Sequence, residues 1–420
     1  MHLNTESSAL SPENWPFSLE LLPQPAYLVG GAVRDALLKR SREYLDLDFV
    51  IPTDAVNTAR KIAAHYNAGF VLLDADRQIA RVVFKHATAD FAQAEGGSLE
   101  ADLHRRDYRM NAIAYNPRTG EIIDPLEGYA DLQQGIIRMV SAKNLQDDPL
   151  RLLRGYRQAA QLNFIIEPET RSAISKLAPL LSQIAAERVR VEFSYLLGIP
   201  LGTVWISAAF CDGLLPVLFP NVTPESLEKM AAVDSWAVAL AESWPELKAE
   251  LSADIRGTIK TTLWSVAKLA TLLPASPEVA EEQLFRLKYS RVEIRAVTTV
   301  IKCLPTLMSG GNPSEMSLRE QYFFFRGAET NFLAIALLAV ASGVEVNSIA
   351  GLINRYLNPD DQVAHPTPLI TGNELMEALK IPSGQLVGQL LGEIQASRAE
   401  GKISTPAEAL EFASQILDTK

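Results

Sequence analysis

The segment 27–51 constrains the fold most, because it sets a tight glycine turn beside a strand that carries two aspartates. Residues 27–29 are apolar and β-prone, which predicts a short buried strand. At Gly30 and Gly31 the backbone can turn sharply and approach a ligand closely. Residues 32–39 favour a helix whose first N–H groups point back at the glycines. The segment therefore predicts a phosphate-sized loop followed by a second strand.

In that second strand, Asp46 and Asp48 alternate with Leu45, Leu47 and Phe49. A strand has a period of two residues, so both aspartates face one side and the apolar side chains face the core. Two carboxylates on one face repel each other unless a cation lies between them, and Mg²⁺ prefers carboxylate and phosphate oxygens. An isolated pair more often belongs to a solvated strand face. The glycine turn upstream instead favours a metal site for phosphoryl transfer.

The composition is that of an ordinary globular chain. At 420 residues, 48% of them hydrophobic and 21% charged, the chain is long enough for about two to four domains. It has no apolar run of membrane-spanning length and no N-terminal signal pattern, which predicts a soluble, cytoplasmic protein without a membrane partner. A net charge of −11 argues against a general nucleic-acid binder but allows one local RNA-binding face. Cys211 and Cys303 lack metal-binding spacing and are predicted to be reduced core residues.

The chain resembles a known family at the segment just described. LVGGAVRDALL at 28–38 followed by DLDFV at 46–50 is similar to the head-domain signature of the class II tRNA nucleotidyltransferases and bacterial poly(A) polymerases. The family's later motifs appear in order at 105–112, 127–138, 147–162 and 187–192. The resemblance implies an α+β N-terminal head, with a polymerase-β-like nucleotidyltransferase sheet and helices, followed by an all-α neck, body and tail. It also implies Mg²⁺ as the cofactor.

The hydrophobic pattern changes near residue 145, from short β-like runs mixed with helices to an almost wholly helical pattern. Together with the resemblance, this change predicts a division into five parts. These are a mobile N-terminal segment over 1–25, the catalytic head over 26–140, a helical neck for base recognition over 141–215, a helical body over 216–365 and a tRNA-binding helical tail over 366–420.

Two-metal sites of this type usually need a third carboxylate. Residues 81–93 resemble a strand, a turn and a second strand that carries Asp90. The resemblance implies that Asp46 and Asp48 are the catalytic metal ligands, and that Asp90 orients or activates the 3′-hydroxyl of the primer. The alternative is that Asp90 is an ordinary hairpin aspartate.

The resemblance places further nucleotide-binding groups in the head. Gly30, Gly31 and Arg34 are expected at the triphosphate of the incoming nucleotide. Arg106 can bind a phosphate. Asp107 can accept a hydrogen bond from a ribose hydroxyl, which favours ribonucleotides over deoxyribonucleotides.

A predicted helix over 147–162 gives the most specific clue to the substrate. Asp148, Arg151, Arg154 and Arg157 recur every three residues and share one polar face. The resemblance implies that Asp148 and Arg151 bind the Watson–Crick edge of the incoming base, since an aspartate accepts from an exocyclic amine while an arginine donates. Arg154 and Arg157 are expected at the triphosphate. The alternative is an ordinary helix with an exposed basic stripe.

The chain departs from the family pattern at several places. Tyr108, Arg109 and Asp147 stand where the family usually has phenylalanine, threonine and glutamate. Between Asp90 and the following motif, full CCA-adding members usually carry a longer flexible loop, which helps the site to change from CTP to ATP. The short segment 91–104 predicts an enzyme that performs part of the reaction, with CC addition favoured over A addition.

The predicted activity is template-independent nucleotide addition to a tRNA 3′ end. The RNA 3′-hydroxyl attacks the α-phosphate of CTP or ATP, and pyrophosphate is released. The implied partners are tRNA, held at its 3′ end and elbow, CTP and/or ATP, and, for a partial reaction, a second nucleotidyltransferase that completes the CCA end. A bacterial poly(A) polymerase is the alternative within the class. A catalytically inactive nucleotide- or RNA-binding protein is the alternative of another class.

Overall fold

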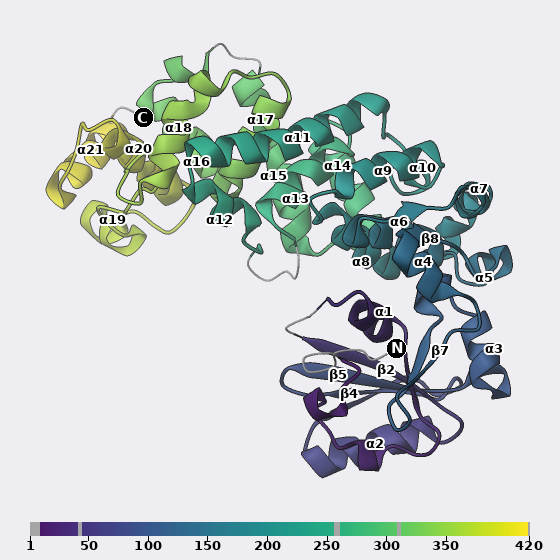
Figure 1. Ribbon diagram of the computed structural model, residues 1–420. Helices are drawn as coiled ribbons and strands as arrows, with labels where there is room; N and C mark the ends of the chain where they lie inside the picture. Colours follow the sequence, from purple (N-terminus) through teal and green to yellow (C-terminus); the bar gives the residue numbers. More distant parts are fainter. Residues whose placement is uncertain (1–8, 41–43, 256–260, 309–311, 419–420) are drawn as a thin grey trace. The chain divides into compact units, whose positions relative to one another are not determined.

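The computed structural model describes residues 9–40, 44–255, 261–308 and 312–418 (Figure 1). The chain forms two compact units. The first contains residues 1–185 together with 208–217, and the second contains 186–207 together with 218–420. The predicted fold class is confirmed, since a mixed sheet with helices is followed by a long helical region.

A seven-stranded sheet with strand order β3-β4-β5-β2-β1-β6-β7 forms the centre of the first unit. Its strands are β1 Tyr27–Val29, β2 Leu45–Ile51, β3 Gly69–Asp74, β4 Ile79–Val83, β5 Ala87–Gln93, β6 Ala114–Asn116 and β7 Glu121–Ile123. Strands β2 and β5 pair in parallel, and the other neighbours are antiparallel. The parallel pair lies at the middle of the sheet and positions the carboxylates.

The helices of the first unit are α1 Gly31–Leu37, α2 Ala55–Tyr66, α3 Leu99–His104, α4 Gly128–Gln134, α5 Ala142–Asp147, α6 Leu150–Leu162 and α7 Pro168–Leu177. Helix α2 buries Ala55, Ala59 and Ile62, which recur at helical spacing on one face. A short parallel pair, β8 Ile136–Ile137 with β9 Ile165–Ile166, joins the segment before α5 to the end of α6.

Residues 9–25 pack on the sheet, although the sequence predicted a mobile segment over 1–25. The Trp15 ring meets the Phe49 ring edge-on at 5.0 Å between centroids, and Phe17 lies 5.7 Å from Phe49. Phe49 in turn stacks on Phe91 at 5.3 Å. Burial of aromatic surface thus holds a proline-bearing stretch that has no regular periodicity. Residues 1–8 lie outside the described residues.

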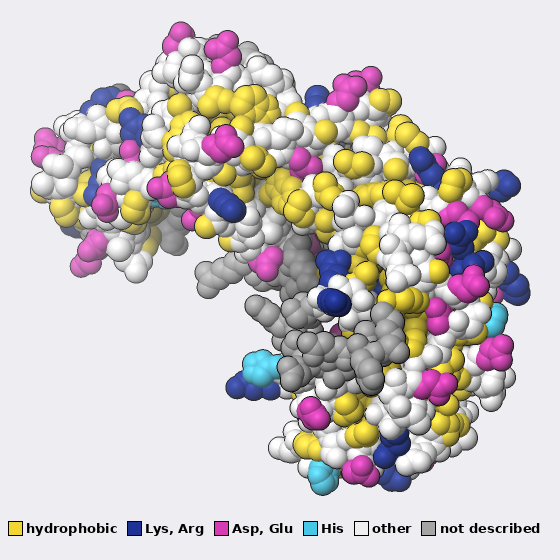
Figure 2. Space-filling view, viewed as in Figure 1, with side chains coloured by type: hydrophobic (Ala, Val, Ile, Leu, Met, Phe, Trp, Pro, Cys, Tyr) yellow, Lys and Arg dark blue, Asp and Glu magenta, His cyan; other side chains and the backbone are white. Residues whose placement is uncertain are grey.

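The second unit is built from helices. They are α8 Ala186–Leu197, α9 Gly202–Cys211, α10 Leu215–Leu218, α11 Pro224–Ser243, α12 Glu246–Ser252, α13 Leu263–Thr271, α14 Pro277–Arg286, α15 Arg291–Met308, α16 Leu318–Ala328, α17 Phe332–Ala341, α18 Val346–Leu357, α19 Gly372–Leu379, α20 Gln385–Ala399 and α21 Pro406–Asp418, with the end of α9 and most of α10 belonging to the first unit. The last three helices share a core of their own, in which Leu375, Leu390 and Ala409 are buried. On the face drawn in Figure 2, basic and acidic side chains are interspersed over these helices.

Two expectations from the sequence need correction in this region. The sequence predicted no apolar run of membrane-spanning length, because charged residues interrupt the segment 318–341. By length and composition, however, this segment is apolar enough to span a membrane. Its most apolar window is 72% buried, as in the core helix of a globular protein. Cys303 is buried as predicted, whereas Cys211 is exposed because α9 ends there.

Candidate active site

Three carboxylates come together on one face of the sheet. The parallel register sets Asp48 opposite Asp90 and Asp46 opposite Thr88. The Thr88 hydroxyl donates a hydrogen bond of 2.6 Å to Asp46. The alternating Leu47 is fully buried on the opposite face, as the period of two predicts. The strand register therefore gathers the predicted catalytic residues, which lie about 40 positions apart in the chain.

The carboxylates differ in their electrostatic surroundings. Burial, together with the negative charges of Asp46 and Asp90, raises the pKa of Asp48 to about 7. Asp90 is instead neutralised by Arg81, whose guanidinium donates to both carboxylate oxygens at 2.6 and 2.8 Å. Asp48 thus carries a repulsion that a cation beside it would relieve.

The donor set fits a divalent cation only if the substrate contributes oxygens. In the part of the chain that the structure describes, no group of three His, Cys, Asp or Glu side chains is arranged to hold a metal ion. Asp46 and Asp48 offer oxygens on one face, while Asp90 is bound to Arg81. Mg²⁺ is commonly held by one or two carboxylates together with substrate phosphates. The two aspartates match that pattern.

The glycine turn approaches these carboxylates closely. Gly30 has φ 71°, a conformation that side chains rarely adopt. A Cβ placed there would lie 3.3 Å from an Asp48 carboxylate oxygen and 3.3 Å from the Arg106 guanidinium. Gly30, Asp48 and Arg106 therefore border one small space, as the predicted roles require.

Arg34 lies behind the turn, with 4% of its surface exposed. Its guanidinium donates to Asp35 at 2.8 Å and to Asn111 at 2.9 Å. A Cβ on Gly31 would lie 3.6 Å from the same guanidinium. Arg34 supports the turn from inside, and its contact with a triphosphate stays a prediction.

Asp107 is a buried, charged group that links the head to α6. It accepts hydrogen bonds from the Tyr108 amide at 2.7 Å, from Asn111 at 3.0 Å and from Arg154 at 3.2 Å. Burial alone would raise its pKa, but the Arg154 cation and these hydrogen bonds outweigh it and hold the pKa of Asp107 below its usual range. The carboxylate is therefore ionised at neutral pH and can accept a further hydrogen bond.

The predicted reading helix is α6, and its polar face points toward the segment 105–111. The Arg151 guanidinium donates to the carbonyl oxygens of Arg105 at 2.8 Å and Asn144 at 3.0 Å, and burial lowers its pKa. The sequence predicted one helix over 147–162, but α5 ends at Asp147 and α6 begins at Leu150, so Asp148 lies in an extended conformation between the two helices. Arg157 donates to Gln161 at 3.0 Å, along the helix. Arg154 and Arg151 thus lie near Asp107. The roles of Asp148, Arg151, Arg154 and Arg157 in nucleotide binding stay predictions.

Sequence reasoning missed two residues of this site. Arg81 was not considered, although it faces Asp90 in the hairpin register. Asn111 lies within a motif that was recognised, but its role was not. Its amide joins Arg34, Asp107 and Gln158 in one buried network. Strand register was the signal available for Arg81, and only the fold reveals Asn111.

The segment 91–104 is folded. It continues β5 to Gln93, forms a 3-10 turn over Glu95–Gly97 and then the helix α3, whose first turn is capped by the Ser98 hydroxyl. Glu95 forms an ion pair with Arg105, and Asp102 pairs with Arg106 at 3.1 Å. These contacts tie both ends of the segment to the motif at 105–112.

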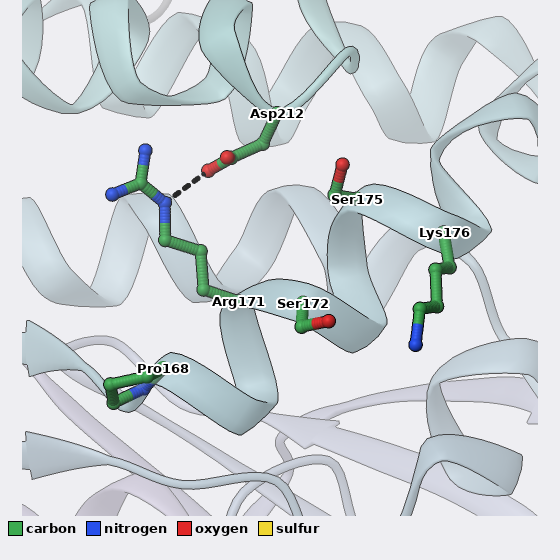
Figure 3. Close-up of a pocket in the computed structure, with 6 residues that line it drawn as sticks. All are labelled: Pro168, Arg171, Ser172, Ser175, Lys176 and Asp212. Carbon is green, nitrogen blue, oxygen red and sulfur yellow. Dashed lines mark hydrogen bonds and ion pairs between the residues drawn. The ribbon is translucent and has the colours of Figure 1, made fainter.

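A cavity of about 400 Å³ lies elsewhere in the first unit (Figure 3). Its lining residues are Pro168, Arg171, Ser172, Ser175, Lys176 and Asp212. Arg171 and Asp212 are paired across it at 2.6 Å. None of the predicted site residues lines this cavity, so the carboxylates of the sheet, where Asp48 has a perturbed pKa, stay the candidate active site.

The chain is similar to proteins of tRNA 3′-end synthesis along most of its length. Residues 26–138 match the family model of the poly A polymerase head domain, 163–225 that of a "probable RNA and SrmB- binding site of polymerase A", and 258–413 that of a putative second domain of tRNA nucleotidyltransferase.

Two relatives and one solved structure illustrate the similarity. A CC-adding tRNA nucleotidyltransferase of Synechocystis sp. is 48% identical, with 96% of each chain covered. An A-adding tRNA nucleotidyltransferase of Deinococcus radiodurans is 30% identical, with 93% of this chain and 95% of that protein covered. The CCA-adding enzyme of Thermotoga maritima, complexed with tRNA, has a TM-score of 0.69 at 26% identity and covers 94% of this chain and 91% of that one.

Proposed function

Because the chain belongs to the class II tRNA nucleotidyltransferase and poly(A) polymerase family, whose members extend RNA 3′ ends, we propose that it adds the two C residues of the CCA end and stops there. The observation that carries the proposal is the folded segment 91–104, held at both ends by ion pairs. A segment fixed in this way has little freedom to remodel the site between CTP and ATP. The 48% identity to a CC-adding enzyme supports the same choice.

The proposed reaction joins the tRNA 3′-hydroxyl to the α-phosphate of CTP. The bond from the α-phosphate to the bridging oxygen breaks, and pyrophosphate leaves. Asp46 and Asp48 would hold Mg²⁺, which neutralises the triphosphate and the developing charge. The hydroxyl proton would pass to Asp90 once its carboxylate turns from Arg81 toward the primer.

The remaining groups would position the nucleotide. The turn at Gly30 and Gly31 and the Arg106 guanidinium would contact phosphates, and Asp107 would accept from a ribose hydroxyl. Arg154 and Arg157 would extend the phosphate contacts. Asp148 and Arg151 would bind the Watson–Crick edge of the base, as the sequence predicted, so that protein replaces a template.

The domain roles extend this proposal. We assign catalysis to 26–140, base recognition to 141–215 and tRNA contacts to the tail over 366–420, whose helices have their own core. The body over 216–365 would connect the two. Since the product ends in CC, an enzyme that transfers an adenylate must complete the end.

The test offers purified protein a tRNA that lacks its three terminal nucleotides, with CTP and ATP together and with each alone. We expect extension by two nucleotides with CTP, and the same product when ATP is added. A complete CCA end would refute CC-only addition, and a long A tail would identify a poly(A) polymerase. Failure to incorporate any nucleotide with Mg²⁺ would identify an inactive binding protein. Asp48→Asn serves as the inactive control.

A further inference from the structure

We propose that the hydroxyl of Tyr108, seated in the space left by Gly155, fixes the first turn of α6 and thereby sets the choice between C and A. The inference rests on the proposed function, because it assigns base reading to α6. It makes Tyr108 a positioning residue, since its side chain acts on the helix that carries Arg151 and begins two residues after Asp148.

The first observation is the hydrogen bond that Tyr108 makes. Its side chain is fully buried, and its hydroxyl donates to the backbone carbonyl of Arg151 at 2.7 Å. In an α-helix that carbonyl also faces the amide of Gly155, four residues on. Tyr108 therefore holds the backbone of α6 at the residue proposed to read the base.

The second observation is the fit between Tyr108 and Gly155. A Cβ at Gly155 would lie 2.3 Å from the Tyr108 hydroxyl oxygen and 3.1 Å from its Cζ. A glycine inside a helix costs about 1 kcal/mol relative to alanine. The hydroxyl occupies the space that the missing Cβ leaves, so the two residues form a matched pair.

The other described hydrogen bonds between the segment 105–111 and α6 all use a side chain of α6, as when Arg151 donates to the carbonyl of Arg105. Asp107 pairs with Arg154 at 3.2 Å, and Asn111 donates to Gln158 at 3.0 Å. Side chains of this kind can exchange partners when a nucleotide binds. The bond from Tyr108 ends on the helix backbone, so it fixes the position of α6 relative to Asp107 whatever the side chains do.

A fixed separation between Asp107 and the start of α6 discriminates between bases. Asp107 is proposed to contact the ribose, and Asp148 and Arg151 the base edge. The exocyclic amine of adenine lies farther from the ribose than that of cytosine, and in a different direction. A pocket held at one separation therefore satisfies its polar groups with one of the two bases, and a mismatched base leaves them unpaired.

The test compares two buried tyrosines whose hydroxyls donate to different acceptors. Tyr108→Phe removes the hydroxyl and keeps the ring. Tyr156→Phe is the matched control, because Tyr156 is equally buried on α6 but donates to Asp212. For each protein, kcat/KM is measured for CTP and for ATP on a tRNA that lacks its three terminal nucleotides.

We expect Tyr108→Phe to lower the preference for CTP over ATP several-fold, up to about tenfold, the worth of one buried hydrogen bond. Tyr156→Phe should leave that ratio unchanged. If both variants change the ratio equally, or neither does, while thermal unfolding shows both folded, the hydroxyl is only structural and the inference is wrong.

A second pair of variants tests the fit itself. Gly155→Ala should impair CTP incorporation because its Cβ meets the Tyr108 hydroxyl, and adding Tyr108→Phe should restore part of the loss. Independent, additive effects of the two changes would overturn the pairing. If the wild type makes a complete CCA end, the proposed function fails, whereas the ratio measured on the first nucleotide still decides the role of Tyr108.

Discussion

Asp48→Asn should stabilise the metal-free protein while it abolishes nucleotide incorporation. The pKa of Asp48 is about 7 in the folded protein against 3.8 for a free aspartate, because of burial and the neighbouring Asp46 and Asp90. At about 1.36 kcal/mol for each tenfold change in proton affinity, the charged carboxylate destabilises the folded state by roughly 4 kcal/mol. Asp48 is only half-buried, so water screens part of this repulsion and the figure is an upper limit.

The dependence on pH gives the prediction its sign. The folded pKa lies above the unfolded one, so between about pH 4 and pH 7 the folded state binds more protons. The free energy of unfolding therefore falls as pH rises through this window, and the full penalty remains above pH 7. Replacement by asparagine removes this part of the pH dependence. Added Mg²⁺ should stabilise the wild type at pH 8 more than at pH 5.5, since metal and proton compete for the carboxylate.

The assay must report on the first unit alone, because a chain of two units has no single free energy of unfolding. Native-state hydrogen exchange of peptides from β2 and β5, followed by mass spectrometry in EDTA at pH 8, meets this need. Asp90→Asn is the control with the opposite sign, since it leaves Arg81 without its bidentate partner. If the asparagine at 48 leaves β2 no more protected than in the wild type, the proposed repulsion does not exist.

Three further changes test other parts of the molecule. Gly30→Ala should lower kcat at least tenfold and destabilise the first unit by about 1 kcal/mol, because it forces a side chain into a positive φ next to Asp48; single-turnover kinetics and hydrogen exchange of β1 would show it. Asp148→Ala should blur base choice more than it slows transfer, and equal preference for CTP before and after the change would contradict a reading role. Lys268→Met should destabilise the second unit by about 3 kcal/mol, because it breaks the buried ion pair with Asp234. Nucleotide incorporation at 25 °C should stay unchanged, and urea unfolding monitored by amide hydrogen exchange of α13 measures the loss of stability.

The face that carries the carboxylates was predictable because one physical constraint dominates there. In β2, the apolar alternation forces Leu47 and Phe49 inward, so Asp46 and Asp48 must share the other face. The start of α6 was likewise signalled by Pro149, which suits the first turn of a helix.

Partners chosen by tertiary packing were not predictable. The residues next to Asp90 in the sequence do not indicate whether its carboxylate forms an ion pair. Arg81 lies opposite Asp90 because of the register in which β4 pairs with β5. The packing of Trp15 and Phe17 on the sheet follows from aromatic surface, which has no period in an irregular segment. The burial of Arg34 depends on Asn111, a residue far along the chain.

The return of residues 208–217 to the first unit has a consequence for how the protein is made. Leu214 and Leu215 in this stretch are buried, and Asp212 accepts a hydrogen bond from the hydroxyl of Tyr156 on α6. During synthesis on the ribosome, the first unit therefore cannot fold completely until the 32 residues 186–217 have been synthesised. At a synthesis rate of about 5–20 residues per second the delay is roughly 2–6 s, during which α6 lacks its contact with Asp212. A nascent chain stalled before residue 217 should accordingly be a good substrate for chaperones and proteases.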